Sequence, residues 1–350
     1  MAVTTPAELR EHIALAIQVE LSTIPVYLYA MYSIEDQESE AALLIRSVVV
    51  EEMLHAALAT NLLLAVGGTP TYSSPASLPR YPGFLAHHTP PLELRLEPCS
   101  QELIESLFLV IEKPELHETL PDGDDYRTLG QFYHALEIAL SDLDDSHDLF
   151  GAPRLDAQMT DPSFYTPVAY DAPGSGGLVA VTDLASAHEA IHIIVHQGEG
   201  VSEDKWADPA HQELTHYAKF LRLADGTAPI GHVAPATINP TVAGLPEEVR
   251  PVADLFNAAY RYSYLTMDAI FTAGSDKGTL VSRLYRLMSE VMGPLGRYLM
   301  TLPVGDRVAG PTFENYGFTG DPLPEMAMMA GEVADRHDDL RQVVDSITAL

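Results

Sequence analysis

Hydrophobic residues recur at alternating steps of three and four along much of the chain, and two of these stripes contain acidic side chains. Such steps place side chains on one face of an α-helix. One stripe runs Leu9, Ile13, Ala16, Glu20, Ile24, Tyr27, Met31, and the next runs Ala41, Ile45, Val48, Glu52, His55, Ala59, Leu62, Val66. A carboxylate in an apolar stripe is costly to bury unless it is paired, protonated or bound to a cation. Glu20, Glu52 and His55 are therefore expected to share a metal ion.

Helix start and stop signals predict an antiparallel pair of long helices at the beginning of the chain. Thr5 and Glu8 form a capping box, and Pro6 suits the first position of a helix that reaches about residue 32. The second helix covers about residues 39–66 and ends at Gly67, where a left-handed backbone costs least.

The rest of the chain also predicts helices, and strand-like alternation is scarce. Further helices are expected at about residues 101–113, 128–150, 182–197, 208–224, 246–273, 277–302 and 324–350, with long loops at 69–98 and 151–177. The fold class is therefore all-α, a four-helix bundle with long crossover loops and an additional C-terminal helical region. A stretch rich in Pro and Gly at 226–246 predicts two domains, a metal-binding bundle over 1–235 and a helical region over 236–350 that packs on it.

The spacing of Glu52 and His55 suits metal binding, because residues three apart lie on one helix face. Glu213 and His216 repeat the spacing, although such a pair is equally compatible with a solvated surface. Bundles that hold two iron or manganese ions take one carboxylate from each of two helices and a Glu-x-x-His pair from each of the other two. Glu20 fits the first carboxylate.

The second carboxylate has two candidates. Glu112 ends an apolar run, and Glu199 lies in a Gly-Glu-Gly sequence near a helix end. His196, three residues before Glu199, is expected either to bind metal or to contact a ligand. Glu51 is expected to be a surface charge or a partner of a ligand, since it lies about 100° around the helix from Glu52.

Composition narrows the classes of function. The single cysteine, Cys99, excludes an internal disulfide and any thiolate-based metal site in one chain. A formal net charge of −31 argues against nucleic acid and anionic membranes as partners. Charged residues interrupt the apolar stretch at 41–66, so no membrane span is expected, and the first ten residues lack an export signal, which favours the cytoplasm. Phosphate-loop, dinucleotide and Gly-x-Ser-x-Gly motifs are absent.

Several motifs together resemble the ferritin-like family of iminophenyl-pyruvate dimer synthase, which includes the ferritin-like portions of enzymes that make chromopyrrolate and violacein precursors. The motifs are residues 20–28 (ELSTIPVYL), 51–55 (EEMLH), 111–115 (IEKPE), 197–200 (QGEG) and 214–217 (LTHY). The resemblance implies a ferritin-like bundle with a non-haem iron site. The ligands that it implies are Glu20, Glu52, His55, Glu112, Glu199 and His216.

The leading functional hypothesis is a non-haem metal oxidoreductase, with two iron ions as the first expectation and a single ion, manganese or another divalent metal as alternatives. It would use dioxygen or peroxide on a small amino-acid-derived substrate, such as an imine that is oxidatively coupled, in a pocket between the bundle and the C-terminal helices. No catalytic residue besides the metal ligands is assigned. The alternatives are iron binding with ferroxidase activity and a non-catalytic ferritin-like scaffold, and homo-oligomerisation stays open.

Overall fold

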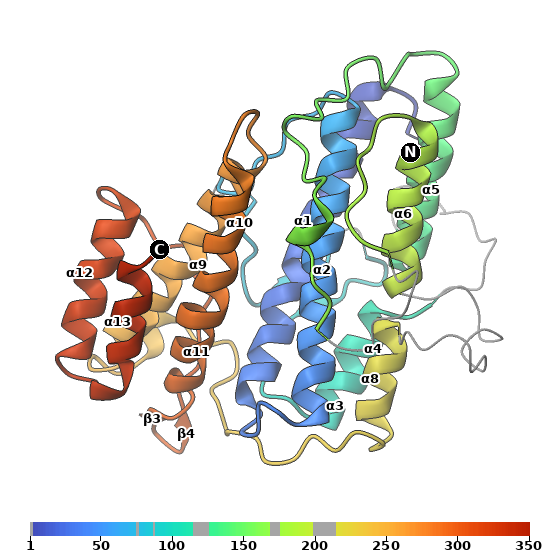
Figure 1. The fold of residues 1–350 in the computed structure, drawn as a ribbon. Coiled ribbons are helices and arrows are strands. Elements are labelled where there is room, and N and C mark those ends of the chain that lie inside the picture. Colours follow the sequence, from blue (N-terminus) through green and yellow to red (C-terminus); the bar gives the residue numbers. More distant parts are fainter. Residues whose placement is uncertain (1–2, 75–76, 87, 115–125, 169–175, 199–214) are drawn as a thin grey trace.

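Two long antiparallel helices form the centre of the N-terminal part of the molecule. The computed structural model describes residues 3–74, 77–86, 88–114, 126–168, 176–198 and 215–350. In it α1 (Pro6–Ser33) and α2 (Glu40–Ala65) lie side by side along their whole length (Figure 1). The predicted capping box is present, since the amide of Glu8 donates to Thr5 Oγ1 (3.2 Å) and the Glu8 carboxylate accepts from the Thr5 amide (3.0 Å).

Burial explains why α1 and α2 are so apolar. Both helices are long and hydrophobic enough to cross a membrane, but 72% and 89% of their most apolar windows are buried inside the fold. The helices therefore have the composition of core elements, which need apolar residues on most of their circumference.

The other two positions of the bundle are each shared by two shorter helical stretches. The first combines α3 (Gln101–Leu103), a π-helical turn (Ile104–Phe108) and α4 (Leu109–Ile111) with α5 (Leu129–Asp144). The second combines α6 (Leu184–Gly198) with α8 (His216–Ala224). Figure 1 shows α5 and α6 along one half of the α1–α2 pair, and α3, α4 and α8 along the other half.

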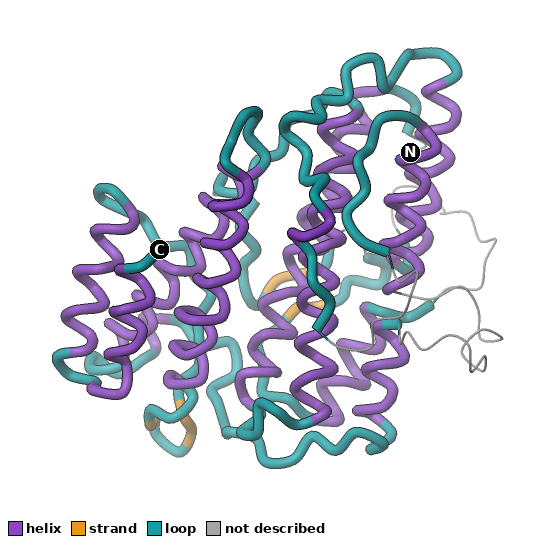
Figure 2. The backbone as a smooth tube through the Cα atoms, viewed as in Figure 1, coloured by secondary structure: helices purple, strands orange, loops and turns teal. Residues whose placement is uncertain are grey.

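The C-terminal helices pack beside α1 and α2 on the face away from α5 and α6. They are α9 (Arg250–Ile270), α10 (Lys277–Arg286), a π-helical turn (Leu287–Met292), α11 (Gly293–Leu299), α12 (Pro322–Ala334) and α13 (Arg341–Thr348). Among the described residues, strands occur only as two short hairpins (Figure 2). In one hairpin β1 (Gly83–Phe84) pairs with β2 (Glu93–Leu94), and in the other β3 (Pro303–Val304) pairs with β4 (Arg307–Val308). Short 3₁₀ turns occupy Pro162–Phe164, Val242–Gly244 and Asp338–Leu340. The all-α fold class is confirmed.

Two predicted helices were too long. The helix expected over 324–350 ends at Ala334 and resumes at Arg341, and the helix expected over 128–150 ends at Asp144. In both places the apolar stripe is interrupted by polar residues rich in aspartate, 335–339 and 144–148. Aspartate competes for backbone hydrogen bonds and so favours turns over helix interiors. The start of the helix expected at residue 208 lies outside the described residues.

The two predicted domains are joined by close packing against α1. The Tyr29 hydroxyl, in the first predicted domain, donates to the carbonyl of Thr237, in the second. A side chain on Gly310 would overlap the Tyr29 ring. The division at residues 235 and 236 stays a prediction.

We expect Gly310→Ala to lower the free energy of unfolding by about 1–3 kcal/mol, because the added methyl group must displace a fully buried tyrosine in a close-packed core. Urea denaturation monitored by circular dichroism measures the change. Gly317→Ala is the matched control, since nothing lies within 4 Å of its added carbon. An equal effect of the two variants would contradict the tight packing at Gly310.

Candidate metal centre

Polar side chains gather where the interrupted bundle helices meet α1 and α2. Glu112 directly follows α4, and His216 is the first residue of α8. Glu20 comes from the middle of α1, while Glu52 and His55 come from α2. All five residues are at most 2% exposed. The structure therefore brings together five of the six residues that the sequence and the family resemblance indicated.

One half of the cluster is built around His55. Its Nδ1 lies 3.5 Å from Glu20 Oε2 and 3.6 Å from Glu52 Oε2. Its Nε2 lies 2.9 Å from Gln197 Oε1 and, because the amide oxygen can only accept, donates a hydrogen bond to it. In the neutral imidazole this bond leaves the lone pair of Nδ1 directed at the two carboxylates, which is the orientation that a metal ligand needs.

The other half is built around His216. Its Nδ1 lies 3.2 Å from Glu52 Oε1 and 3.4 Å from Glu112 Oε2, and its Nε2 lies 3.0 Å from Glu51 Oε2. The two imidazole rings stack with their centroids 5.2 Å apart. Glu52 therefore stands between the two histidines, with one carboxylate oxygen toward each.

Two tyrosines fix the outer carboxylates. Tyr27 donates to Glu112 Oε1 (2.6 Å), and Tyr133, from α5, donates to Glu20 Oε1. Each carboxylate thus uses one oxygen for a tyrosine and turns the other toward a histidine. Burial, followed by the charge of Glu112 for Tyr27 and of Glu20 for Tyr133, raises the pKa of both hydroxyls well above the usual value, so both stay protonated as donors.

The electrostatics of the cluster favour a cation. Burial raises the pKa of Glu52 well above the usual value, and the negative charges of Glu20 and Glu112 raise it further. The pKa of Glu20 falls to about 2 despite its burial, because His55 and Glu52 donate to it. The pKa of His216 rises well above the usual value although burial opposes this, chiefly because Glu112 is close. Without a metal ion, protons must compensate the excess of carboxylates.

The space between these groups fits one or two small ions. A cavity of about 20 Å³ is lined by Glu20, Glu52, His55, Glu112, Leu129, Gly130, Tyr133, Ile194, Val195, Gly198 and His216. Glu52, His55 and His216 can each offer a ligand atom within 4.8 Å of the others. Both ring nitrogens of His216 are buried without a well-aligned hydrogen bond, although carboxylates surround them. Carboxylate oxygen and imidazole nitrogen are donors that iron and manganese accept, so the residues fit a non-haem metal.

Glu51 is not a surface charge. It is 4% exposed and forms an ion pair with Lys219 of α8, whose side chain is fully buried. The pKa of Glu51 is lowered although burial raises it, because Lys219 and His216 stabilise the carboxylate. The alternative interpretation, a partner of a ligand, agrees with its contact to His216 Nε2.

Some sequence candidates lie outside the cluster or outside the described residues. Glu199 and Glu213 both fall in the range 199–214, so their roles stay predictions. His196 is half-buried and does not line the small cavity; its ring lies 5.6 Å from that of exposed His192.

The sequence reasoning missed the side chains that position the cluster. Neither Tyr133 nor Lys219 was among the candidate site residues, although Tyr133 donates to Glu20 and Lys219 donates to Glu51. Gln197 lies in one of the family motifs but was not assigned a role. For Lys219 a usable signal exists, since it lies three residues after His216 on the same helix face.

The larger cavity of the protein is separate from this cluster. The expected pocket between the bundle and the C-terminal helices exists, but it shares no lining residue with the small cavity, from which α1 and α2 separate it. Besides the clustered carboxylates and imidazoles, the small cavity is bordered by Leu129, Gly130, Tyr133, Ile194, Val195 and Gly198.

Comparison with known proteins places the chain in a family. A model described as ferritin-like matches residues 13–225. The chain is 27% identical to the 2-imino-3-(indol-3-yl)propanoate dimerase of Chromobacterium violaceum, over 92% of this chain and 34% of that protein. It is 26% identical to the dichlorochromopyrrolate synthase of Lentzea aerocolonigenes, over 89% of this chain and 36% of that protein. The chain thus spans about a third of the length of these curated relatives.

A solved structure supports the same fold. The crystal structure of a ferritin-like protein from Caulobacter vibrioides aligns with a TM-score of 0.63 and 24% identity, covering 91% of this chain and all of the other. The family resemblance indicated by the motifs is confirmed, because the two curated relatives are enzymes of the kind that it names. With a matching model over most of its length and the helical architecture described above, the chain belongs to the ferritin-like family.

Proposed function

We propose that the protein is a non-haem iron oxidoreductase, with two iron ions in its buried cluster, that acts on a small amino-acid-derived substrate. The observation that carries the proposal is the convergence of three carboxylates and two imidazoles, all in residues at most 2% exposed, with the carboxylate of Glu52 between the two imidazoles. A buried group of this kind is unfavourable unless cations compensate it.

The arrangement of the oxygens supports two ions rather than one. Glu20, His55 and Glu52 Oε2 would hold one ion, while Glu112, His216 and Glu52 Oε1 would hold the other. Each set contains two carboxylates and one imidazole, and the central carboxylate belongs to both. These five donors match all but one carboxylate of the di-iron bundle pattern, which uses four glutamates and two histidines.

The chain's own residues prepare the site for redox chemistry. Bound iron would supply the electron transfer to dioxygen or peroxide that oxidises the substrate. Tyr27 and Tyr133 hold the outer carboxylates, and Gln197 holds His55 in the orientation that exposes Nδ1. Apolar Leu129, Ile194 and Val195 border the cavity and keep bulk water from it.

The names of the relatives suggest the substrate class. One is a dimerase of 2-imino-3-(indol-3-yl)propanoate, and the other is a dichlorochromopyrrolate synthase. By analogy, the substrate here is an imine derived from an aromatic amino acid. The reaction is its oxidative coupling: two imines lose two hydrogens as a carbon–carbon bond forms, and dioxygen gains them as hydrogen peroxide.

Single-turnover measurements test the proposal. The protein is loaded with Fe²⁺ without air, mixed with freshly generated 2-imino-3-(indol-3-yl)propanoate and exposed to dioxygen. We expect iron-dependent oxygen uptake and a product with the mass of two imines less two hydrogens. Oxygen uptake that oxidises iron but leaves the imine unchanged would favour a ferroxidase, and failure to bind iron would favour a scaffold.

A further inference from the structure

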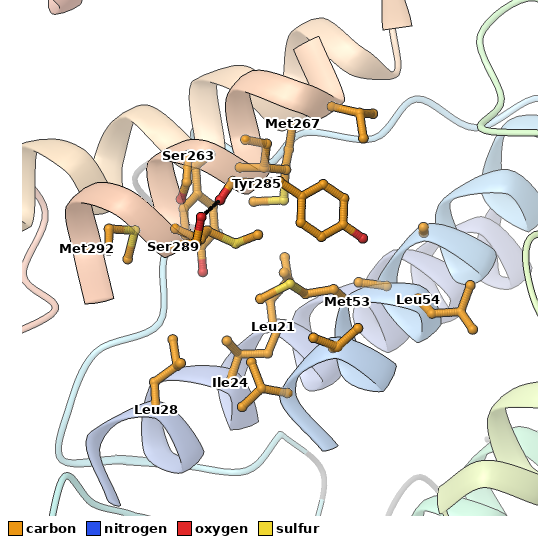
Figure 3. Close-up of a pocket in the computed structure, with 18 of the residues that line it drawn as sticks. Leu21, Ile24, Leu28, Met53, Leu54, Ser263, Met267, Tyr285, Ser289 and Met292 are labelled. Carbon is orange, nitrogen blue, oxygen red and sulfur yellow. Dashed lines mark hydrogen bonds between the residues drawn. The ribbon is translucent and has the colours of Figure 1, made fainter. Parts of the chain in front are cut away.

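A second, larger cavity lies between the bundle and the C-terminal helices. Its volume is about 460 Å³, within the range of pockets that hold small organic molecules. Leu21, Ile24 and Leu28 of α1 and Met53 and Leu54 of α2 form one wall, and Figure 3 shows them facing side chains of the C-terminal helices across the gap. It lies on the face of α1 and α2 opposite the metal centre.

The second wall is also largely apolar and adaptable. Met267 of α9, Met288 and Met292 of the π-helical turn, and Leu284 and Tyr285 of α10 contribute to it (Figure 3 labels Met267, Tyr285 and Met292). Methionine side chains are flexible and polarisable and can adapt to ligands of different shape. A hydrophobic body therefore fits the space between the two walls.

The otherwise largely apolar lining of the cavity includes two arginines. Arg46 of α2 and Arg297 of α11 both line the cavity and are both half-buried. Among the described carboxylates, none lies within ion-pair distance of either guanidinium. Arg46 has one hydrogen bond, from Nη2 to the carbonyl of Gln37 (2.9 Å).

The two guanidinium groups are close enough to repel each other. Burial lowers the pKa of Arg297, and the positive charge of Arg46 lowers it further, although Tyr32 acts in the opposite direction. Two like charges without an acidic partner are unfavourable in an apolar environment. An anion between them would relieve both the burial cost and the repulsion, and a carboxylate accepts hydrogen bonds from two guanidinium groups well.

The arginines lie toward one end of an elongated space. Arg46 is near the start of α2, and Ala57, which also lines the cavity, is eleven residues further along the same helix, about 16 Å away. Tyr72 shares a hydrogen bond with Thr60, three residues beyond Ala57 on α2, and stacks on Phe271 with ring centroids 5.7 Å apart; both rings line the cavity. The cavity is thus cationic at one end and aromatic at the other.

We propose that this cavity binds an organic carboxylate with a long apolar body, with the acid group between Arg46 and Arg297 and the body between α1, α2 and the C-terminal helices. Fatty acids and aromatic acids share this chemistry. The site is distinct from the metal centre and does not rest on the proposed oxidoreductase function.

Isothermal titration calorimetry on the full chain tests the proposal with four probes: decanoate, 4-(indol-3-yl)butanoate, and the primary amide of each. We expect at least one carboxylate to bind with one site per chain and its amide to bind about tenfold more weakly, since the amide loses the charge-assisted hydrogen bonds. The two carboxylates distinguish an aliphatic from an aromatic ligand.

Variants locate the binding site. Arg46→Gln and Arg297→Gln should each weaken carboxylate binding about tenfold and leave amide binding unchanged, while Arg297→Lys should recover part of the affinity. Met288→Trp should block all probes by filling the cavity. Arg341→Gln, at an exposed position away from the cavity, is the matched control and should bind as the unaltered protein does.

Three results would overturn the proposal: no binding of either carboxylate at 1 mM, equal affinity for acid and amide, or unchanged acid affinity in both arginine variants. Circular dichroism melting curves verify that each variant is folded. Glu52→Ala should bind the carboxylate normally, so failure of the metal centre and failure of this cavity are distinguishable.

Discussion

Glu52→Ala is expected to abolish binding of both iron ions, so that iron per chain falls from about two to near zero. Glu52 is 2% exposed and directs one oxygen toward His55 Nδ1 (3.6 Å) and the other toward His216 Nδ1 (3.2 Å). Its removal deprives both ion positions of a ligand at once. No other carboxylate among the described residues contacts both histidines.

His55→Ala is expected to have a smaller effect on iron content than Glu52→Ala. Only one of the two proposed ion positions uses His55, so this variant is expected to keep about one ion per chain. Iron is measured by elemental analysis after anaerobic loading with Fe²⁺ and desalting. Anomalous scattering from a crystal of the loaded protein would then give the two positions directly.

Glu189→Ala is the matched control for the metal measurements. Glu189 is an exposed carboxylate on α6, the helix that also carries Gln197, and it does not line the small cavity. The control should retain full iron content. If Glu52→Ala also retained it while remaining folded, the assignment of the central ligand would be wrong.

The second large effect concerns stability. Lys219→Met is expected to lower the free energy of unfolding of the metal-free protein by about 3–5 kcal/mol, the range found when one partner of a buried ion pair is removed. Lys219 is fully buried and donates to Glu51, which is itself 4% exposed. Without the ammonium group, Glu51 must remain buried as an unpaired charge or take up a proton.

The pKa of Glu51 also predicts how the stability difference between the protein and Lys219→Met changes with pH. The pKa of Glu51 in the folded protein is lowered, although burial alone would raise it, because Lys219 and His216 stabilise the charged form. A lowered pKa contributes stability that is present above the unfolded value and is lost as the pH falls through the folded value. The difference between the protein and Lys219→Met should therefore shrink as the pH falls below 4.5.

Urea denaturation between about pH 3 and pH 8 measures both effects, because the expected loss begins below the unfolded pKa of the carboxyl group. The double variant Glu51→Gln/Lys219→Met should recover part of the lost stability, because it leaves no buried charge. Arg341→Met removes an exposed ion pair with Asp338 and should change stability little. An effect of Lys219→Met no larger than that of Arg341→Met would show that the buried pair contributes little.

The sequence alone predicted the helices and most of the metal cluster, because both depend on residues that are close to one another in the sequence. The alternating steps of three and four that mark α1 and α2 also place Glu20, Glu52 and His55 on their buried faces. The capping box at Thr5 and Glu8 likewise needs only neighbouring residues. The family motifs added Glu112 and His216, whose own spacing would have left their role open.

The tertiary structure decided what orients and surrounds these groups. The contact of His55 with Gln197 joins residues 142 positions apart, and that of Lys219 with Glu51 joins residues 168 positions apart. The two arginines of the larger cavity come from α2 and α11, in different parts of the chain. Periodicity shows which face of a helix is buried, but the partner of that face depends on how distant helices pack. For this reason the ligand types could be predicted from the sequence, while their hydrogen-bond partners and the second cavity could not.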